Sequence, residues 1–147
     1  MFTSLHIRDF LLRQNRDPLR IERRNPHRHL ALDPKAAAGP DEFKLSGSWR
    51  IEADPSPSAG LAGQDVSEFL TGMGVDLQKQ GTACLQVGLA PDLSPRAFRL
   101  QCEPGAICIT GGDAAGLWAG VAWLEREMRI RRGPILPRGT QARSAAW

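Results

Sequence analysis

The residues with the clearest chemical potential lie between positions 107 and 125, where the chain reads ICITGGDAAGLWAGVAWLE. A short apolar strand leads through two glycines into a helical pattern, and such a turn can bind phosphate at the start of the helix. A dinucleotide fingerprint anchored on Gly111 and Gly116 would need glycine where the chain has Asp113, whose carboxylate would repel a pyrophosphate. A Walker-type loop would need lysine where the chain has Leu117. This turn is therefore not expected to bind phosphate.

The same residues fit a structural role. Asp113 can accept hydrogen bonds from the first N–H groups of a helix. Gly112, Gly116 and Gly120 recur every four residues on one side of that helix, where a missing side chain lets the backbone approach the sheet. Glycine inside a helix costs about 0.5 to 1 kcal/mol relative to alanine, which favours a packing reason for it. We expect Asp113 to cap the helix and the three glycines to be contact points.

Other catalytic patterns are weak. The three histidines, His6, His27 and His29, all lie in the first 29 residues, and the chain has no Gly-x-Ser-x-Gly turn. His27 and His29 fall in a proline-bounded loop with no nearby cysteine or carboxylate set except Asp33. Asp41 and Glu42 are adjacent, and adjacent side chains diverge on a strand, so they do not resemble the carboxylate pair of a glycosidase. The sequence predicts no catalytic, cofactor-binding or metal-binding residue, and no cofactor.

Cysteine usage indicates neither a zinc site nor a redox motif. Cys84, Cys102 and Cys108 are odd in number and lack a Cys-x-x-Cys pair. We interpret all three as reduced, buried, small hydrophobic residues.

The net charge of +3 is unevenly distributed. Residues 1 to 30 carry seven Arg and three acids, residues 126 to 147 carry six Arg and one acid, and the middle carries six basic and twelve acidic residues. Basic termini that neutralise an acidic middle, or a neighbouring domain, are the favoured interpretation. A nucleic-acid surface is the alternative, and it would require binding that weakens steeply with salt.

The end of the last predicted helix is rich in arginine, at Arg126, Arg129, Arg131 and Arg132. Cations are stabilised there by the helix dipole, which explains the cluster without a ligand. A docking surface for a following domain and a nucleic-acid contact are the other two interpretations. Trp118 and Trp123 lie about 140° apart on this helix, so only one of them can share the core stripe and the other is left for a partner.

These residues must be positioned by a small number of elements. Apolar periodicity predicts a short helix at 3 to 15, extended segments near 19 to 21 and 30 to 32 around the turn Asn25-Pro26, and a loop at 34 to 41. It further predicts either a bulged strand or a tight hairpin spanning 43 to 53, a helix at 61 to 75 ending near Gly74, and strands at 83 to 89, 97 to 103 and 106 to 110. The last two strands should form an antiparallel hairpin.

The final helix should run from Asp113 to about Arg132 with a core stripe of Leu117, Val121, Leu124 and Met128. Gly133-Pro134 should stop it, and no further element is expected after it. The predicted class is α+β, with a mainly antiparallel or mixed sheet of four or more strands covered on one face by two helices.

The length of 147 residues suits one domain. No apolar run is long enough for a membrane span and the N-terminus lacks the pattern of a signal peptide, so we expect a cytoplasmic protein without a membrane partner.

The segment RAFRLQCEPGAICITGGDAAGLWAGVAWLEREM resembles the small N-terminal domain that precedes the catalytic barrel in β-N-acetylhexosaminidases of glycoside hydrolase family 20 and in related α-glucuronidases. The resemblance rests on the strand 97 to 100, the strand 107 to 109, the Gly-x-Asp-x-x-Gly motif at 111 to 116, and Gly120 in the helix that follows. It covers about residues 42 to 137 and departs from the family at Trp118 to Ala122, where a Gly-x-Gln segment is common.

The resemblance implies a non-catalytic accessory domain of a bacterial-type glycoside hydrolase, whose catalytic carboxylates lie in a barrel outside this chain. Its expected partner is that barrel, contacted through the basic helix end and the C-terminal link, with self-association in its absence. We expect residues 1 to 40 to be an extension, 41 to 137 the domain, and 138 to 147 a truncated linker, so that the chain is a fragment. An autonomous Arg-rich module that binds nucleic acid or protein is the alternative.

Overall fold

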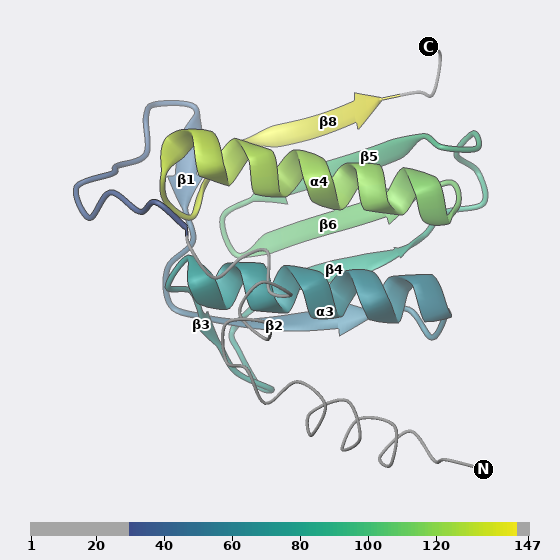
Figure 1. Cartoon of the computed structure of the whole chain (residues 1–147), viewed down its shortest axis with the longest axis horizontal. Coiled ribbons are helices and arrows are strands. Elements are labelled where there is room, and N and C mark those ends of the chain that lie inside the picture. The colour runs from purple at the N-terminus through teal and green to yellow at the C-terminus, as the bar shows by residue number, and fades with distance from the viewer. Residues whose placement is uncertain (1–29, 144–147) are drawn as a thin grey trace, which may run out of the picture.

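The computed structural model describes residues 30 to 143 (Figure 1). The elements along the chain are β1 (Glu42–Lys44), β2 (Ser48–Ala53), α3 (Pro57–Gly72), β3 (Asp76–Leu77), β4 (Ala83–Leu89), β5 (Phe98–Glu103), β6 (Ala106–Gly111), α4 (Ala114–Arg131), β7 (Ile135–Pro137) and β8 (Gly139–Arg143). The predicted helix at 3 to 15, the extended segment near 19 to 21 and the turn Asn25-Pro26 lie outside the described residues.

Six strands form one mixed sheet in the order β3-β2-β4-β6-β5-β8. β2 runs parallel to β3 and β4, and β4 runs parallel to β6, whereas β5 is antiparallel to both β6 and β8. The α+β class and the β5–β6 hairpin are confirmed. Of the two predicted kinds of sheet, mainly antiparallel or mixed, the structure has the mixed one, with parallel strands at its centre. The long helical connection α3 returns the chain to the same end of the sheet, which makes β2 and β4 parallel.

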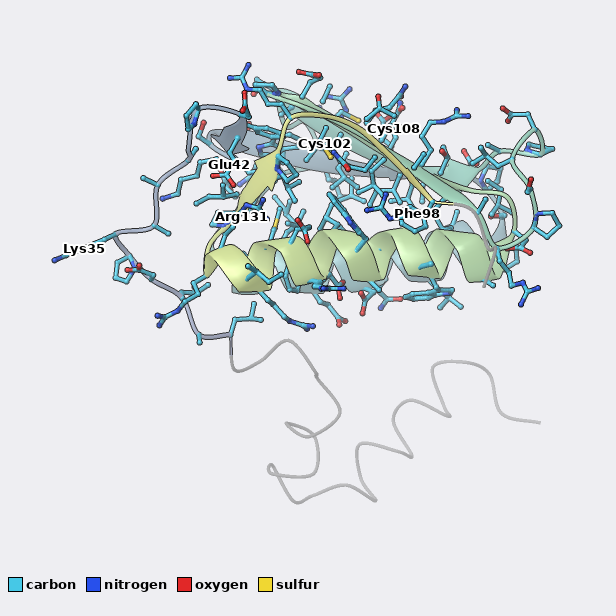
Figure 2. All side chains as sticks on the ribbon, turned by 90° about the horizontal axis from the view of Figure 1, so that it is seen from above. Lys35, Glu42, Phe98, Cys102, Cys108 and Arg131 are labelled. Carbon is cyan, nitrogen blue, oxygen red and sulfur yellow. The ribbon has the colours of Figure 1, made fainter. Side chains whose placement is uncertain are left out.

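Both helices pack on one face of this sheet, as predicted (Figures 1 and 2). The core stripe of α4 is confirmed, because Leu117, Val121, Leu124 and Met128 are fully buried. They meet buried side chains of the sheet: Leu85, Val87, Phe98, Leu100, Cys102, Ile107 and Ile109. The opposite face of the sheet has no helix on it in the described part of the chain.

Helix α3 begins at Pro57, four residues before the predicted start. The Ser56 side chain accepts a hydrogen bond from the Ala59 N–H at 3.1 Å, and proline at the first helical position is pre-set for a helix. The predicted helix, which began at residue 61, did not include this Ser-Pro pair. The helix ends where predicted, with Gly74 at φ 86°.

Strand β1 does not pair with β2. It forms a separate two-stranded antiparallel sheet with β7, in which Phe43 lies opposite Leu136. Gly47, at φ 73°, lies between β1 and β2 and turns the chain from one sheet to the other. The predicted hairpin and its alternative, one bulged strand, are therefore both wrong, because alternation of side chains identifies a strand but not its partner.

The prediction that no element follows α4 is also wrong. Residues 135 to 137 form β7 and residues 139 to 143 form β8, which pairs with β5 at the edge of the main sheet. Both strands are short, and β8 is largely polar, so they carry little periodicity of their own. The limits proposed for the extension, the domain and the linker stay predictions. Among the described residues, no helix is long and apolar enough to cross a membrane.

Candidate functional site

The turn that suggested phosphate binding is filled by the protein itself. One oxygen of Asp113, Oδ1, accepts hydrogen bonds from the Gly116 N–H at 2.8 Å and from the Arg96 N–H at 3.0 Å. The predicted cap is confirmed, and the same carboxylate ties the loop before β5 to the start of α4. Because a carboxylate occupies the position that an anion would need, this helix terminus is not an anion site.

The three glycines are contact points, as predicted, although their partners differ. A side chain at Gly112 would meet the carbonyl oxygen of Ser94, and one at Gly116 would meet that of Ala97. At Gly120 it would lie 3.0 Å from the Ile109 side chain. The first two glycines therefore accommodate the loop before β5, and only the third brings α4 close to the sheet.

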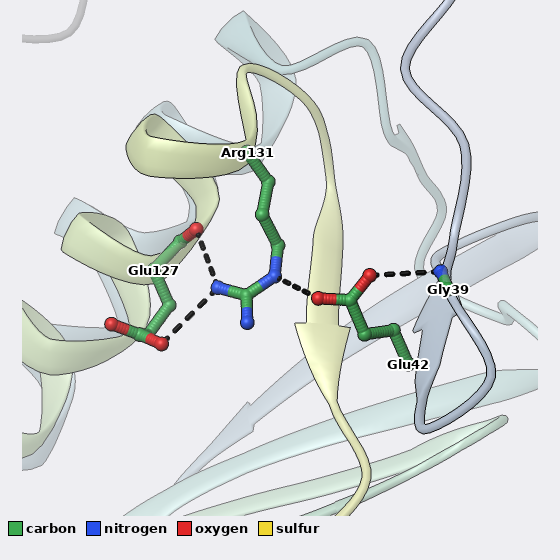
Figure 3. Close-up of polar contacts among 4 residues, drawn as sticks. All are labelled: Gly39, Glu42, Glu127 and Arg131. Carbon is green, nitrogen blue, oxygen red and sulfur yellow. Dashed lines mark hydrogen bonds and ion pairs between the residues drawn. The ribbon is translucent and has the colours of Figure 1, made fainter.

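The arginine-rich end of α4 is engaged with the rest of the domain (Figure 3). Arg131 donates from Nε to Glu42 Oε2 at 2.6 Å and from Nη1 to Glu127 Oε1 at 3.1 Å, and the other Glu42 oxygen accepts from the Gly39 N–H at 2.8 Å. The hydrogen bond from Arg131 holds the pKa of the Glu42 carboxyl below its ordinary value, and the Gly39 N–H adds to this effect. This network ties β1 and the loop before it to the helix.

Two further arginines of the cluster also make intramolecular contacts. The Arg129 guanidinium lies 5.3 Å from the centre of the Phe69 ring on α3. Arg132, with the left-handed φ of 58°, ends the helix and donates from Nε to the Ala31 carbonyl at 3.2 Å. Arg126 is exposed. The docking and nucleic-acid interpretations of this cluster both stay predictions.

A buried carboxyl group lies on α4, at a residue that the sequence patterns did not single out. Glu125 is only 6% exposed. Burial, followed by the hydrogen bond and charge of Asp65, raises the pKa of Glu125 to about 9, against a smaller lowering by Arg129. The burial of Glu125 could have been predicted from its position in the sequence. It lies four residues after Val121 and three before Met128, on the buried side of the helix.

The cysteines are free thiols, but only one matches the expected burial. Cys102 is fully buried, whereas Cys84 and Cys108 are half-buried on the face of the sheet away from the helices. Burial raises the pKa of all three thiols, to about 12 for Cys102, which keeps them protonated and poorly nucleophilic.

The remaining sequence candidates do not assemble into a site. Asp41 is exposed while Glu42 turns to Arg131, so the adjacent acids diverge as expected. His6, His27 and His29 lie outside the described residues. Within residues 30 to 143, no group of three His, Cys, Asp or Glu side chains is arranged to hold a metal ion.

The two faces of the domain differ in chemistry. Large exposed apolar side chains of the described part lie on the helices or beside them: Leu61 at 60% exposure, Trp118 at 38%, Ile130 at 62% and Leu32 at 40%. Trp123, by contrast, is half-buried against the core. As predicted, therefore, only one of the two tryptophans packs against the core. The open sheet face is polar, and its shallow hollow of about 480 Å³ includes Arg50, Gln86 and Gln101 in its lining.

The described residues thus form an α+β domain of a six-stranded mixed sheet, a two-stranded antiparallel sheet and a layer of two helices. Residues 34 to 140 match the model of the family described as glycosyl hydrolase family 20, domain 2. The chain belongs to this family. A comparison with curated protein sequences gives no match.

Solved structures share the fold. The GH20 β-N-acetylhexosaminidase from Streptomyces coelicolor A3(2) aligns with a TM-score of 0.58 and 20% identity over 74% of this chain and 24% of that one. CpGH84B aligns with a TM-score of 0.53 and 16% identity, over 78% of this chain and 22% of that one. A GH138 enzyme targeting pectin rhamnogalacturonan II aligns with a TM-score of 0.52 and 15% identity, over 66% of this chain and 12% of that one. The chain therefore spans about a quarter or less of the length of these structures.

Proposed function

We propose that this chain is the non-catalytic domain of a glycoside hydrolase, and that it packs against a catalytic barrel outside residues 1 to 147 and supports it. The family match supports the assignment, since the matched model is named as one domain of a larger enzyme. The proposed packing against the barrel rests on the exposed apolar side chains of the helix layer, which are Leu61, Trp118 and Ile130.

The two faces of the domain differ in the free energy needed to remove them from water, and this difference indicates which face the barrel covers. On the open sheet face, Arg50 Nε already donates to Glu52 Oε1 at 2.9 Å, and the other Glu52 oxygen lies 3.4 Å from Gln86 Nε2. Covering these groups would cost desolvation, whereas covering Leu61 and Trp118 removes apolar area from water at about 25 cal/mol per Å². We therefore assign the helix layer as the surface that the barrel covers.

The arginine end of α4 extends this surface. Arg126 is exposed at the same end as Ile130, and Arg132 lies beside the exposed Leu32. An apolar patch bordered by cations fits a partner with carboxylates at the rim of its interface, because arginine makes bidentate contacts with carboxylates.

The test is co-expression with the family 20 barrel encoded with this chain, either downstream in the reading frame or elsewhere in the genome. The chain should copurify with the barrel, and the double variant Leu61→Asp, Trp118→Asp should lose most of this binding. The matched control is Gln101→Ala on the open sheet face, which should bind as the wild type does. The chain alone should not hydrolyse an aryl N-acetyl-β-glucosaminide.

Three results would refute the proposal. Turnover of that glycoside by the purified chain would make it an enzyme. The absence of any such barrel from the genome, or equal binding by the double variant and the wild type, would remove the proposed partner or the proposed surface.

A further inference from the structure

A hollow of about 440 Å³, called the helix-end hollow below, lies where the C-terminal ends of α3 and α4 approach the end of β1. These three ends lie on the same side of the domain (Figure 1). Four segments line the helix-end hollow: residues 32 to 34, 44 to 45, 73 to 74 and 132 to 134. Because the segments are far apart in the sequence, no local pattern predicts it.

The lining of the helix-end hollow is mainly apolar. Leu45 and Met73 are buried, while Leu32 is exposed. Pro34 and Pro134 complete the apolar part of the lining. An apolar cavity of about 150 Å³ already binds benzene, so the helix-end hollow has room for one aromatic or large aliphatic side chain.

Backbone hydrogen bonds hold the walls of the helix-end hollow together. The Asp33 N–H donates to the Arg132 carbonyl at 2.8 Å, which joins the loop before β1 to the end of α4. The Leu45 N–H donates to the Pro134 carbonyl at 2.8 Å, which joins the residue after β1 to the residue before β7. The hollow is therefore already formed without a partner, and a preformed site lowers the entropy cost of binding.

Two cations line the helix-end hollow. Lys44 Nζ donates to the Ala36 carbonyl at 3.3 Å, and Arg132 Nε donates to the Ala31 carbonyl at 3.2 Å. Within residues 30 to 143, neither cation forms an ion pair with a carboxylate, whereas Arg131 binds two. Lysine and arginine carry several N–H donors each, so both can still bind a carboxylate from outside the domain.

Asp33 is the third charged residue of the lining. Its Oδ1 accepts a hydrogen bond from the Lys35 N–H at 2.9 Å, within its own loop. Two cations against one carboxylate give the lining a net charge of +1. An apolar hollow with this charge fits a group that is apolar and has a carboxylate beside it, because arginine binds carboxylates in a bidentate geometry.

The helix-end hollow is continuous with the surface that the barrel is proposed to cover. Leu32 and Arg132 belong to both, and the exposed Ile130 is two residues before Arg132. In protein interfaces, a few anchor residues buried in pockets carry most of the binding free energy.

We propose that the helix-end hollow receives one large apolar side chain of the catalytic barrel, from a segment that has a carboxylate next to that side chain. The inference rests on the proposed function and names the place where the arginine end of α4 recognises the partner. The apolar side chain fills the space between Leu32 and Met73, and the carboxylate binds Lys44 and Arg132.

The compound 3-phenylpropionate, which joins an aromatic ring to a carboxylate, tests the helix-end hollow in the full chain without the barrel. At millimolar concentration it should shift the ¹³C-methyl resonance of Met73 and leave that of Met128, which is fully buried in the core, unchanged. The alcohol 3-phenylpropanol has the same ring without the charge and should bind more weakly, and acetate should cause no shift. Lys44→Glu together with Arg132→Glu should abolish the preference for the acid over the alcohol.

The same double variant tests whether the barrel is the occupant. In co-expression with the family 20 barrel, it should bind about tenfold or more weakly than the wild type, because a carboxylate of the partner would meet two others. Lys79→Glu together with Arg143→Glu is the matched control. It makes the same change of charge at exposed positions outside the helix-end hollow and should bind as the wild type does. Leu32→Asp, at an exposed position of the lining, should also weaken binding and leaves Arg132 in place.

Two results would overturn the inference. The first is an unchanged Met73 resonance in the presence of 3-phenylpropionate. The second is barrel binding at the wild-type level by both the double variant of the helix-end hollow and Leu32→Asp. If Leu61→Asp, Trp118→Asp still loses binding in that case, the proposed function stands and the hollow has another occupant, such as a small carboxylic acid. If that variant also binds as the wild type does, the proposed function fails as well.

Discussion

Asp113 connects two parts of the chain through a single carboxylate oxygen. It accepts hydrogen bonds from the N–H of Gly116 within α4 and from the N–H of Arg96 in the loop before β5. Arg96 has the left-handed φ of 63°. The carboxylate thereby helps to hold a backbone conformation that is uncommon for a residue with a side chain. Glycine is needed at position 116 because a side chain there would collide with the carbonyl of Ala97.

Gly116→Ala should therefore destabilise the domain. The added methyl group would collide with the Ala97 carbonyl, and forced overpacking of this kind costs about 1 to 3 kcal/mol. Gly60→Ala in α3 is the matched control, because a methyl group there meets nothing within 4 Å and alanine favours helices by about 0.5 to 1 kcal/mol. Denaturant unfolding of both variants measures the difference. Equal stability of the two variants would show that the close approach is unimportant.

The contact of α4 with β1 depends on Arg131, which lies between Glu42 and Glu127. β1 and β7 contribute only three residues each to their small sheet. The ion pair of Arg131 with Glu42 therefore helps to hold this sheet against α4. The pair Arg131–Glu42 is separated by 89 positions in sequence, and no local pattern indicates it.

Glu42→Gln should lower the melting temperature at pH 7, since it removes the charge that Arg131 binds. Folding lowers the pKa of Glu42, so its stabilising effect is present above the ordinary value of 4.5 and is lost as pH falls through the folded value. The melting temperatures of the variant and the wild type should then converge in strongly acidic solution. Asp41→Asn, the exposed neighbour, is the control and should have little effect at either pH. A difference between E42Q and the wild type that persists in acid would assign it to packing instead of charge.

At the scale of the whole molecule, the two-layer architecture leaves apolar side chains on the helices and polar side chains on the open sheet face. Exposed apolar side chains on one layer favour association through that layer, because association removes apolar area from water. Leu61 and Trp118 lie near the starts of their helices, and Ile130 near the end of α4. The helix layer is therefore the face on which association should depend.

The chain without its proposed partner should associate with itself at high concentration, because the same apolar surface is then free to pair. Sedimentation velocity should show an average mass that rises with concentration. Leu61→Gln together with Trp118→Gln should reduce this association, while Gln101→Ala on the sheet should leave it unchanged. A wild type that remains monomeric throughout, or an equal effect of the Gln101 variant, would contradict the prediction.

Elements whose signals are local could be predicted from the sequence. The stripe from Leu117 to Met128, the cap at Asp113 and the β5–β6 hairpin follow from periodicity and turn chemistry, and the motif from Gly111 to Gly116 led to the correct family. The pairing of β1 with β7, the place of β8 at the sheet edge and the contact of Arg131 with Glu42 became visible only in the folded structure. The physical reason is that strand partners and buried polar pairs are set by contacts between segments far apart in the chain. Side-chain periodicity reports which face of an element is buried, but not what that face will meet.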